Sequence, residues 1–270
     1  RVFSAAKLFF AYGLGNALSF PLSAGATTIL MAERPTPAAV FKRLIAHQAT
    51  VFYGVPTLYA ALLNDAELPA KSALALRACT SAGEALPADI GRRWREHFLL
   101  DILDGIGSTE MLHIFLSNRP DDVRLGTTGK AVDGYELRLV NDDGEIIDDQ
   151  QLGELQVKGP TAAAMYWNQR ERSRNTFIGQ WTRTGDKDQR DADGYYIYGG
   201  RSDDMLKVGG IYVSPSEVES ALIDHPAVLE AAVVGDEDEA GLTKPRAFVV
   251  LASPETAQAQ LAAELQQFVK

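Results

Sequence analysis

Residues 104–115, with the sequence DGIGSTEMLHIF, place glycines, hydroxyls, a carboxylate and a histidine directly after an apolar run. Glycine lets a backbone approach a flat or anionic ligand, because there is no Cβ to intrude. The hydroxyls of Ser108 and Thr109 suit phosphate oxygens, and the carboxylate of Glu110 suits magnesium. Taken alone, the segment leaves two alternatives open, a plain helix cap and a packing role for His113.

A second pair of residues supports the first segment. Asp186 lies in a Thr-Gly-Asp turn, and Arg201 follows a Gly-Gly pair 15 positions later. A hairpin between them would return both residues to one edge of a sheet, where a carboxylate and a guanidinium could converge on a ribose diol. The two segments together therefore indicate a nucleotide site.

The first hundred residues alternate strand and helix patterns. We expect strands at 27–32, 49–55, 76–81 and 99–105, and helices at 37–48, 56–64 and 86–98. This alternation predicts crossover connections and a largely parallel sheet, with ligand sites beyond the carboxyl ends of the strands. The segments SAGEALP (81–87) and DGIGSTE (104–110) both lie at such ends.

The pattern changes from about Gly126 to short strands with Asp-Gly turns, typical of an antiparallel or barrel-like segment. A helix at 214–225, strands at 228–236 and 244–252 and a final helix are expected to follow. The fold class expected is α/β, with mixed sheets, flanking helices and a β-rich segment in a large domain, then a small α+β C-terminal domain joined by a hinge. The expected domains are 1–202 and 203–270.

Composition limits the function. The chain has 270 residues, is 46% hydrophobic and carries a formal net charge of −10, which disfavours nucleic acid or an anionic membrane as a partner. No apolar run approaches the roughly 20 residues that a membrane helix needs. The single cysteine, Cys79, excludes an internal disulfide and suits a cytoplasmic location, and its apolar neighbours predict a buried, inert thiol.

Five long motifs, in this order, resemble the adenylate-forming superfamily of acyl-CoA synthetases, adenylation domains and luciferases. They are TSAGEALP, DGIGSTEM, GELQVKGPTAAAMYWN, RTGDKDQRDADGYYIYGGRSDDMLKVGGIYVSPSEVE and HPAVLEAAVVGDED. Two further stretches, FFAYGLGNALSFPLSAGATTIL and GSTEMLHIFLSN, most resemble the benzoate-CoA ligase group of aryl-CoA ligases. The resemblance covers almost the whole chain.

The resemblance implies an ATP-dependent ligase that converts benzoate or a close aryl carboxylate to an acyl-adenylate and then to a CoA thioester. The products would be benzoyl-CoA, AMP and pyrophosphate, and the cofactors ATP, magnesium and coenzyme A. The alternative is an adenylation domain that loads an aryl acid onto a carrier-protein phosphopantetheine. A non-enzymatic binding module is disfavoured by the joint presence of Thr109, Glu110, Asp186 and Arg201. A homodimer and the tolerance for substituted benzoates stay open.

The resemblance also implies residue roles. The adenine would be bracketed by Gly83, Glu84, Asp104 and Gly105, the α-phosphate would be touched by Thr109, and magnesium would be bound by Glu110. The ribose would be faced by Asp186 and Arg201. Asp203 would be the hinge, the pantetheine tunnel would be lined by Gly209 and Gly210, and the aryl pocket would be lined by Ala11, Tyr12 and His113. For Tyr12, a core aromatic in a strand-like run is the alternative.

Both ends of the chain suggest a piece of a longer protein. It begins at Arg1 without a methionine and stops at Lys270 inside a helical pattern. By the resemblance, the family's phosphate loop would precede Arg1 and its catalytic lysine would follow Lys270. We therefore expect this segment alone to bind poorly and catalyse little.

Overall fold

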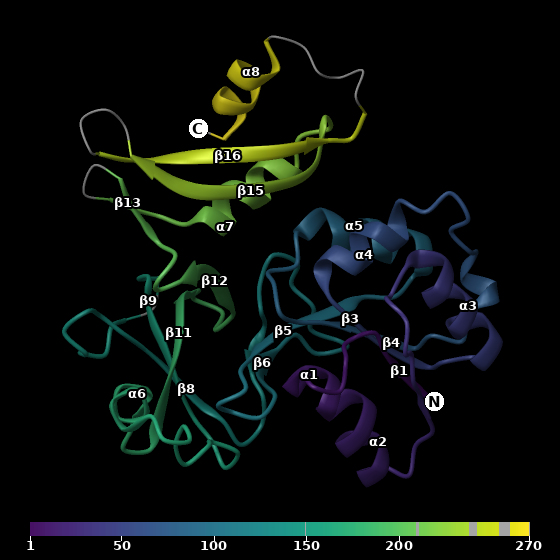
Figure 1. Ribbon diagram of the computed structural model, residues 1–270, viewed down its shortest axis with the longest axis horizontal. Helices are drawn as coiled ribbons and strands as arrows, with labels where there is room; N and C mark the ends of the chain where they lie inside the picture. Colours follow the sequence, from purple (N-terminus) through teal and green to yellow (C-terminus); the bar gives the residue numbers. More distant parts are fainter. Residues whose placement is uncertain (149, 209–210, 238–241, 254–259, 270) are drawn as a thin grey trace.

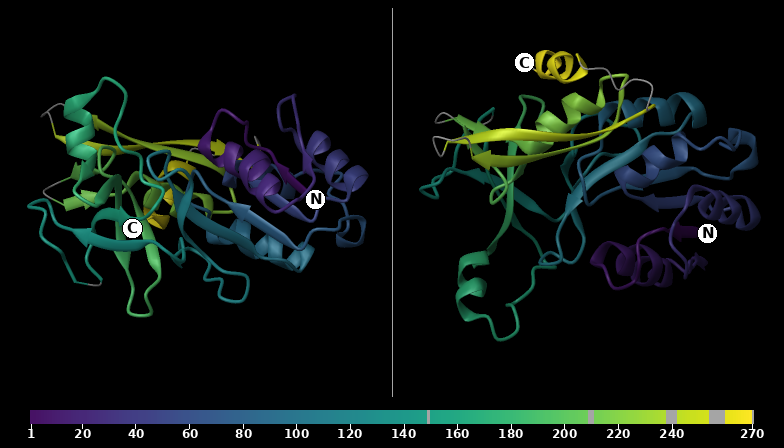
Figure 2. Two further views of the ribbon diagram at one scale, coloured as in Figure 1. Left: turned by 90° about the horizontal axis from the view of Figure 1, so that it is seen from below. Right: turned by 45° about the horizontal axis from the view of Figure 1, so that its top comes forward.

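The computed structural model has a mixed α/β architecture, and within the described part of the chain it forms four sheets flanked by helices (Figure 1). The residues that it describes are 1–148, 150–208, 211–237, 242–253 and 260–269. The expected fold class is confirmed. Strand β1 and helix α8 lie on different parts of the molecule, as two further views show (Figure 2).

The first sheet has seven strands in the order β2-β1-β3-β4-β5-β6-β7. Their bounds are β1 Val2–Ser4, β2 Thr28–Ile29, β3 Val51–Gly54, β4 Ala78–Ser81, β5 Ile102–Gly107, β6 Ile114–Ser117 and β7 Lys130–Ala131. The first five are parallel, as predicted, whereas β6 and β7 add an antiparallel edge. The four strands expected here are confirmed, and the short strand β1 is an addition.

Three predicted helices pack on this sheet: α3 Pro37–His47, α4 Pro56–Leu63 and α5 Ala88–Phe98, with a short 3₁₀ turn, η2, at Lys71–Ala73. The Thr36 hydroxyl accepts the Ala39 amide at 3.4 Å and so caps α3. Trp94 of α5 is fully buried, and its ring centroid lies 4.8 Å from that of Tyr59 and 4.3 Å from that of Phe98. These aromatic contacts join α4 and α5 in one hydrophobic core.

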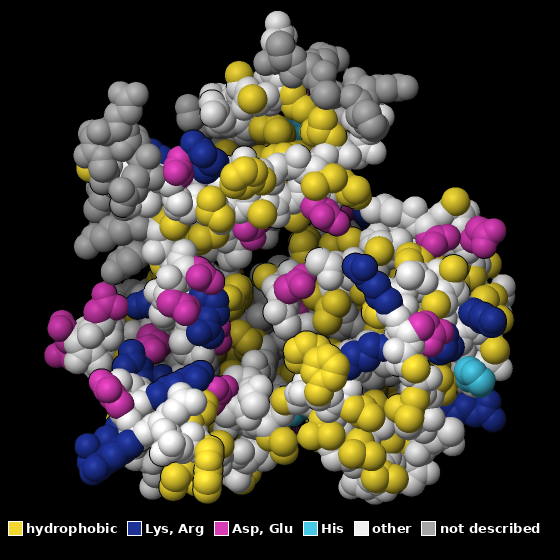
Figure 3. All heavy atoms as spheres, viewed as in Figure 1, with side chains coloured by type: hydrophobic (Ala, Val, Ile, Leu, Met, Phe, Trp, Pro, Cys, Tyr) yellow, Lys and Arg dark blue, Asp and Glu magenta, His cyan; other side chains and the backbone are white. Residues whose placement is uncertain are grey.

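The segment after β1 is helical rather than strand-like. It consists of α1 Ala11–Leu14, a π-helix, η1, at Gly15–Ser19, and α2 Phe20–Ser23. The run that holds Tyr12 is therefore helical and not strand-like, while the choice between a core role and a pocket role for Tyr12 stays open. Apolar side chains gather over α1 and α2 in the space-filling view (Figure 3), and the exposed ones include Leu18 and Leu22.

The second sheet is antiparallel, as predicted for the region after Gly126. Its strands are β8 Glu136–Val140, β9 Gly153–Lys158, β10 Phe177–Ile178, β11 Trp181–Arg190 and β12 Tyr196–Arg201, and helix α6 spans Arg170–Thr176. The order is β10-β11-β9-β8, and β12 pairs with β11. Phe115 of β6 packs in one buried cluster with Leu139 and Leu155 of this sheet, so a shared core joins the two sheets.

The C-terminal part has its own small core. Its elements are β13 Leu206–Val208, β14 Ile211–Val213, α7 Pro215–Ile223, β15 Val228–Glu237, β16 Thr243–Leu251 and α8 Leu261–Phe268. Leu222, Val233 and Leu265 form a separate buried cluster. The predicted helix and strand positions are confirmed, and the hairpin of β13 and β14 is an addition. The division into domains 1–202 and 203–270 stays a prediction.

Two sequence expectations concern single features. Cys79 is buried, as predicted, and burial raises the pKa of its thiol to about 12, which disfavours the reactive thiolate. Among the residues that the structure describes, none belongs to a helix long and apolar enough to cross a membrane.

A buried carboxyl group lies in β11. Asp188 is fully buried, and within the described part of the chain neither of its side-chain oxygens has a hydrogen-bond partner. Burial, followed by the nearby charge of Asp186, raises its pKa well above the ordinary range. The folded protein therefore favours the protonated form of this group.

We expect Trp94→Ala to lower the free energy of unfolding by about 3–5 kcal/mol, because it leaves a cavity between α4 and α5. Urea denaturation would measure the change. The matched control is Trp167→Ala, because the Trp167 side chain is 92% exposed, and we expect a change within about 0.5 kcal/mol. Equal losses in the two variants would contradict the assignment of Trp94 to the core.

We expect Asp188→Asn to flatten the dependence of stability on pH. A raised folded pKa gives stability that is complete below the ordinary aspartate pKa of about 4 and is lost as the pH rises through the folded value. The variant should therefore gain stability over the wild type as the pH rises above about 5 in urea titrations. The exposed Asp143→Asn serves as the control, and parallel curves for wild type and Asp188→Asn would refute the prediction.

Candidate active site

A cavity of about 530 Å³ lies between the first and second sheets. One wall comes from the segments at the carboxyl ends of β4 and β5, including Gly83, Glu84 and Gly105. The opposite wall comes from β11 and β12, including Asp186 and Arg201. Both motifs that suggested a nucleotide site thus face one cavity.

The β11–β12 hairpin brings Asp186 and Arg201 together in direct register, as the sequence predicted. The Arg201 Nη1 donates to Asp186 Oδ1 at 3.3 Å and to the Thr184 carbonyl at 3.0 Å. Asp186 is only 7% exposed; burial raises its pKa, although the charge of Arg201 acts against this. The expected Thr-Gly-Asp turn is instead an irregularity within strand β11, where the pairing with β9 shifts register between Arg183 and Lys187. Gly185 has φ +77° there, and a Cβ would lie 2.8 Å from the Arg201 guanidinium, so this position requires glycine.

Positions 105 and 107 must be glycine for a second reason, besides the close approach of a ligand. Strand β5 continues through Gly105 and Gly107 and pairs with β6, rather than ending in a turn. A Cβ on Gly105 would lie 2.7 Å from the Leu116 carbonyl oxygen, and one on Gly107 would lie 2.4 Å from that of His113. The close approach of β6 therefore also demands glycine here, while both residues still line the cavity.

The turn after β5 presents Ser108 and Glu110 to this cavity. Glu110 Oε1 accepts a hydrogen bond from the Tyr166 hydroxyl at 2.5 Å, and the Glu110 carbonyl accepts the Ala163 amide at 2.7 Å. Burial opposes ionisation of Glu110, but the hydrogen bonds of Tyr166, its own amide and Ser108 lower its pKa overall. The carboxylate is therefore held as an anion at the cavity wall.

A smaller cavity of about 180 Å³ adjoins the first and shares Gly83, Gly107 and Ser108 with it. The predicted aryl-pocket residues Ala11, Tyr12 and His113 all line it, together with Thr109.

Aromatic rings form one side of the smaller cavity. His113 stacks on Tyr12 with ring centroids 5.5 Å apart and meets the edge of Phe20 at 4.7 Å. The Tyr12 hydroxyl and Thr80 Oγ1 share a hydrogen bond of 2.8 Å. Burial lowers the pKa of His113, which favours its neutral ring. A Cβ on Gly15 would lie 2.4 Å from the His113 ring, so the π-helix must carry glycine where it faces this histidine.

Four predicted positions differ from the others. Asp104 is only 6% exposed and lines neither cavity; burial raises its pKa to about 8. It lies behind the wall, where Oδ2 accepts the Leu86 amide at 3.4 Å. Asp203 lies in the exposed turn between β12 and β13, and its Oδ1 accepts a hydrogen bond from Arg201 Nε at 3.1 Å. The predicted tunnel glycines, Gly209 and Gly210, lie outside the described residues.

Sequence reasoning missed several residues that line the larger cavity, among them Tyr166, Arg172 and Tyr198. Tyr166 bonds Glu110, Arg172 lies over the Tyr166 ring with its Cζ 4.2 Å from the centroid, and Tyr198 lines the wall beside Asp186. Tyr166 follows Glu110 by 56 positions, so no local spacing links them. The one available signal was the presence of Tyr166 and Tyr198 inside the quoted family motifs, whereas Arg172 lies in none of them.

The metal-binding capacity of the site is modest. Within the described ranges, no group of three or more histidine, cysteine, aspartate or glutamate side chains gathers to hold a metal ion. Glu110 nevertheless supplies an anionic oxygen donor at a cavity that would hold phosphates. Magnesium commonly keeps several waters and binds through one or two carboxylates plus substrate phosphates. The donor set therefore fits magnesium brought in with a nucleotide.

Comparison with known proteins gives consistent results. The chain is 65% identical over 270 residues to a benzoate–CoA ligase of Thauera aromatica, covering 100% of this chain and 51% of that protein. It spans about half the length of the curated relatives that it matches.

Two solved structures share the fold. A benzoate CoA ligase from Burkholderia xenovorans LB400 matches with a TM-score of 0.94 and 62% identity, over 100% of this chain and 54% of that one. The anthranilate CoA ligase AuaEII, in complex with anthranoyl-AMP, matches with a TM-score of 0.93 and 46% identity, over 99% and 52%.

Family models match both parts of the chain. The one described as AMP-binding enzyme C-terminal domain covers residues 217–270. The one described as AMP-binding enzyme covers residues 1–167, which is more than half of the chain. The chain therefore belongs to the AMP-binding enzyme family.

Proposed function

We propose that the protein activates benzoate with ATP and transfers the benzoyl group to coenzyme A. The observation that supports this most directly is the junction of two cavities of different character, which share Gly83, Gly107 and Ser108. One is lined by charged and hydroxyl side chains, and the other by the rings of Tyr12 and His113. The Thauera aromatica relative is a benzoate–CoA ligase, which supports the same assignment.

The larger cavity would hold the nucleotide. Asp186 would accept hydrogen bonds from the ribose hydroxyls, with Arg201 beside it, and both lie on the wall formed by β11 and β12. Gly83, Glu84 and Gly105 on the opposite wall would contact the adenine. Asp104, behind that wall, would support the adenine site through the Leu86 amide rather than by direct contact.

Glu110 would hold magnesium, with Tyr166 fixing one of its carboxylate oxygens. When bound, the ion would screen the negative charge of the phosphates and so ease the approach of a second anion. Thr109, which is exposed beside the junction, would donate its hydroxyl to the α-phosphate.

The smaller cavity would hold the benzoate ring. Aromatic pairs contribute about 0.5–1.5 kcal/mol beyond burial, so a ring lying against Tyr12 and His113 gains from both. The small side chain of Ala11 leaves room for that ring. The carboxylate of the acid would then point to the shared wall, toward the nucleotide.

The chemistry proceeds in two steps. A benzoate oxygen attacks the α-phosphorus of ATP, the bond to the β-phosphate oxygen breaks, and pyrophosphate leaves. The thiolate of coenzyme A then attacks the benzoyl carbonyl carbon, and AMP leaves with the bonding electrons. Donors at the cavity wall stabilise the negative charge that develops in each step.

We also propose that Asp203 is the hinge between domains 1–202 and 203–270, and that Gly209 and Gly210 line the path of the pantetheine arm. The support is that Asp203 lies in an exposed turn between two sheets with separate cores. Hinge residues are commonly at such element ends. The buried thiol of Cys79 supports a reducing, cytoplasmic location.

The function can be tested with the protein as it is naturally encoded. With benzoate, ATP and magnesium we expect pyrophosphate release, and with free coenzyme A we expect benzoyl-CoA, both detected by chromatography. Asp186→Ala should reduce both by about 10²-fold, because the ribose loses its acceptor. Pyrophosphate release without benzoyl-CoA, together with transfer to a carrier-protein phosphopantetheine, would favour the alternative adenylation domain instead.

Ala11→Met should raise the KM for benzoate by about tenfold, because the longer side chain fills the space for the ring. The KM for ATP and the melting temperature should change little, since Ala11 lines only the smaller cavity. Steady-state kinetics and thermal unfolding measure these quantities. A lower melting temperature with unchanged benzoate kinetics would show that Ala11 belongs to the core and not to the aryl pocket.

A further inference from the structure

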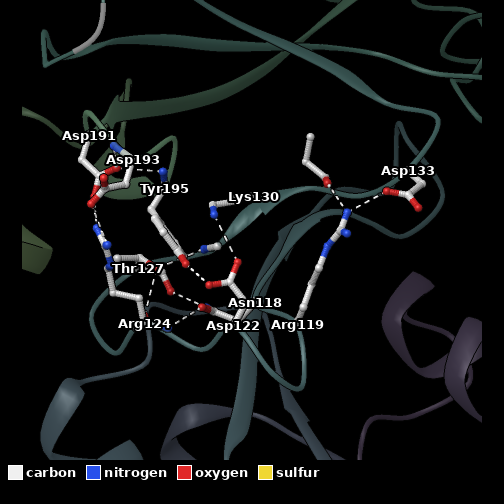
Figure 4. Close-up of polar contacts among 12 residues, drawn as sticks. Asn118, Arg119, Asp122, Arg124, Thr127, Lys130, Asp133, Asp191, Asp193 and Tyr195 are labelled. Atoms are coloured by element: carbon white, nitrogen blue, oxygen red, sulfur yellow. Dashed lines mark hydrogen bonds and ion pairs between the residues drawn. The ribbon is translucent and has the colours of Figure 1, made fainter.

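A cluster of charged and aromatic side chains joins the loop between β6 and β7 to the turn of the β11–β12 hairpin (Figure 4). We call it the clamp. Its members are Asp122, Arg124 and Lys130 on the first side, and Asp191, Asp193 and Tyr195 on the hairpin. None of these residues lines either cavity described above, so the clamp is separate from the site itself.

Arg124 is the centre of the clamp. Its Nη1 lies 2.5 Å from Asp191 Oδ2, and its Nη2 lies 2.8 Å from Asp193 Oδ2. The planar guanidinium thus spans two carboxylates at once, a geometry that suits arginine and not lysine. Asp191 also uses Oδ1 to accept the amides of Asp193 and Tyr195, at 3.0 and 2.9 Å. The same carboxylate therefore shapes the hairpin turn and anchors it to the loop.

Tyr195 is the second anchor. It is only 6% exposed, and the Cζ of Arg124 and the Nζ of Lys130 each lie 4.0 Å from its ring centroid. Its hydroxyl donates to Asp122, which also accepts Lys130 Nζ at 3.1 Å. Two cations on one ring and a bonded hydroxyl leave this side chain little freedom.

Main-chain contacts connect the clamp to the first sheet. The Arg124 amide donates to Asn118 Oδ1 at 3.0 Å. Asn118 Nδ2 in turn donates to the carbonyl oxygens of Thr127 and Asp104, at 2.8 and 3.2 Å. Asp104 belongs to β5, whose end forms one wall of the larger cavity.

The hairpin turn and the predicted ribose pair lie at opposite ends of the same hairpin. Arg190 pairs with Tyr196 next to the turn, and Asp186 pairs with Arg201 at the open end. Four residues of strand span roughly 13 Å. The clamp therefore fixes the turn end of the β11–β12 hairpin, and the open end of the same hairpin forms the second cavity wall.

We propose that Arg124 and Tyr195 are positioning residues that set the spacing between the two walls of the nucleotide cavity. The proposal rests on the proposed function for the identity of the ligand. The clamp acts at a distance, by fixing the hairpin against the first sheet, and contacts neither nucleotide nor acid. Since Arg124 is partly exposed, its loss should affect hairpin position far more than global stability.

The kinetic test compares Arg124→Ala with Arg119→Ala in the naturally encoded protein. Arg119 lies on the same loop, but its partners, Asp133 Oδ1 at 2.6 Å and the Ala131 carbonyl at 3.3 Å, are on its own side of the clamp. We expect Arg124→Ala to raise the KM for ATP about tenfold, with the KM for benzoate within about twofold. Arg119→Ala should match the wild type.

Two further variants sharpen the kinetic test. Tyr195→Phe keeps the ring between the cations but loses the bond to Asp122, so its effect on the KM for ATP should be smaller. Arg124→Lys keeps the charge but cannot span both carboxylates, so it should rescue only part of the loss. An unchanged KM for ATP in Arg124→Ala, or equal rises in the KM for both substrates, would overturn the proposal.

Hydrogen–deuterium exchange of the naturally encoded protein, with no ligand added, tests the clamp independently of turnover. In Arg124→Ala, the amides of residues 182–190 should exchange faster, while those of β3 and β4 stay at wild-type rates. Uniform acceleration in both sheets, or an unchanged hairpin, would refute positioning by the clamp. If the wild-type protein does not turn over benzoate, the proposed function fails, but the exchange experiment still decides whether the clamp fixes the hairpin.

Discussion

Two main-chain hydrogen bonds join the large sheets, and the site depends on them. The Tyr196 amide donates to the Gly129 carbonyl and the Thr128 amide donates to the Tyr196 carbonyl, each at 2.9 Å. Gly129 has φ +87°, and a Cβ there would lie 2.1 Å from the Ser117 carbonyl carbon. No other residue fits this crossing, because both the backbone conformation and the space exclude a side chain. This crossing holds β12, and with it one wall of the larger cavity, against the edge of the first sheet.

The cavity walls show how one short segment can serve two chemical environments. Residues 105–113 supply glycine backbone and Glu110 to the polar cavity, and Thr109 and His113 to the aromatic one. A carboxylate and a phosphate repel each other in a medium of low dielectric, so a reaction between them needs donors at the meeting point. The hydroxyl of Ser108 lies on the wall that both cavities share. Under the proposed function, the aryl ring and the nucleotide would therefore meet only at this shared wall.

Elements with clear periodicity could be predicted from the sequence, and those fixed by tertiary contacts could not. Helices such as α3 show an apolar face in sequence, and the Asp186–Arg201 register follows from hairpin pairing. Strand β1 has only three residues, and the π-helix at Gly15–Ser19 follows no regular period. The contact of Tyr166 with Glu110 depends on a long-range approach that spacing does not encode. The need for glycine at positions 105 and 107 likewise comes from the close approach of strand β6, which the local sequence does not reveal.

The unequal surroundings of the tryptophans have a practical consequence. Trp94 is sealed in the core, while Trp167 is 92% exposed and follows directly after Tyr166 in the chain. An indole in water emits at longer wavelength than a buried one, so the two residues are spectrally distinct. In a variant with the partly exposed Trp181 replaced by phenylalanine, the Trp167 emission therefore offers an intrinsic optical signal, free of any label, for the segment whose Tyr166 contacts Glu110. Quenching of its red-shifted light in a stopped-flow instrument would time ligand arrival at this edge of the molecule.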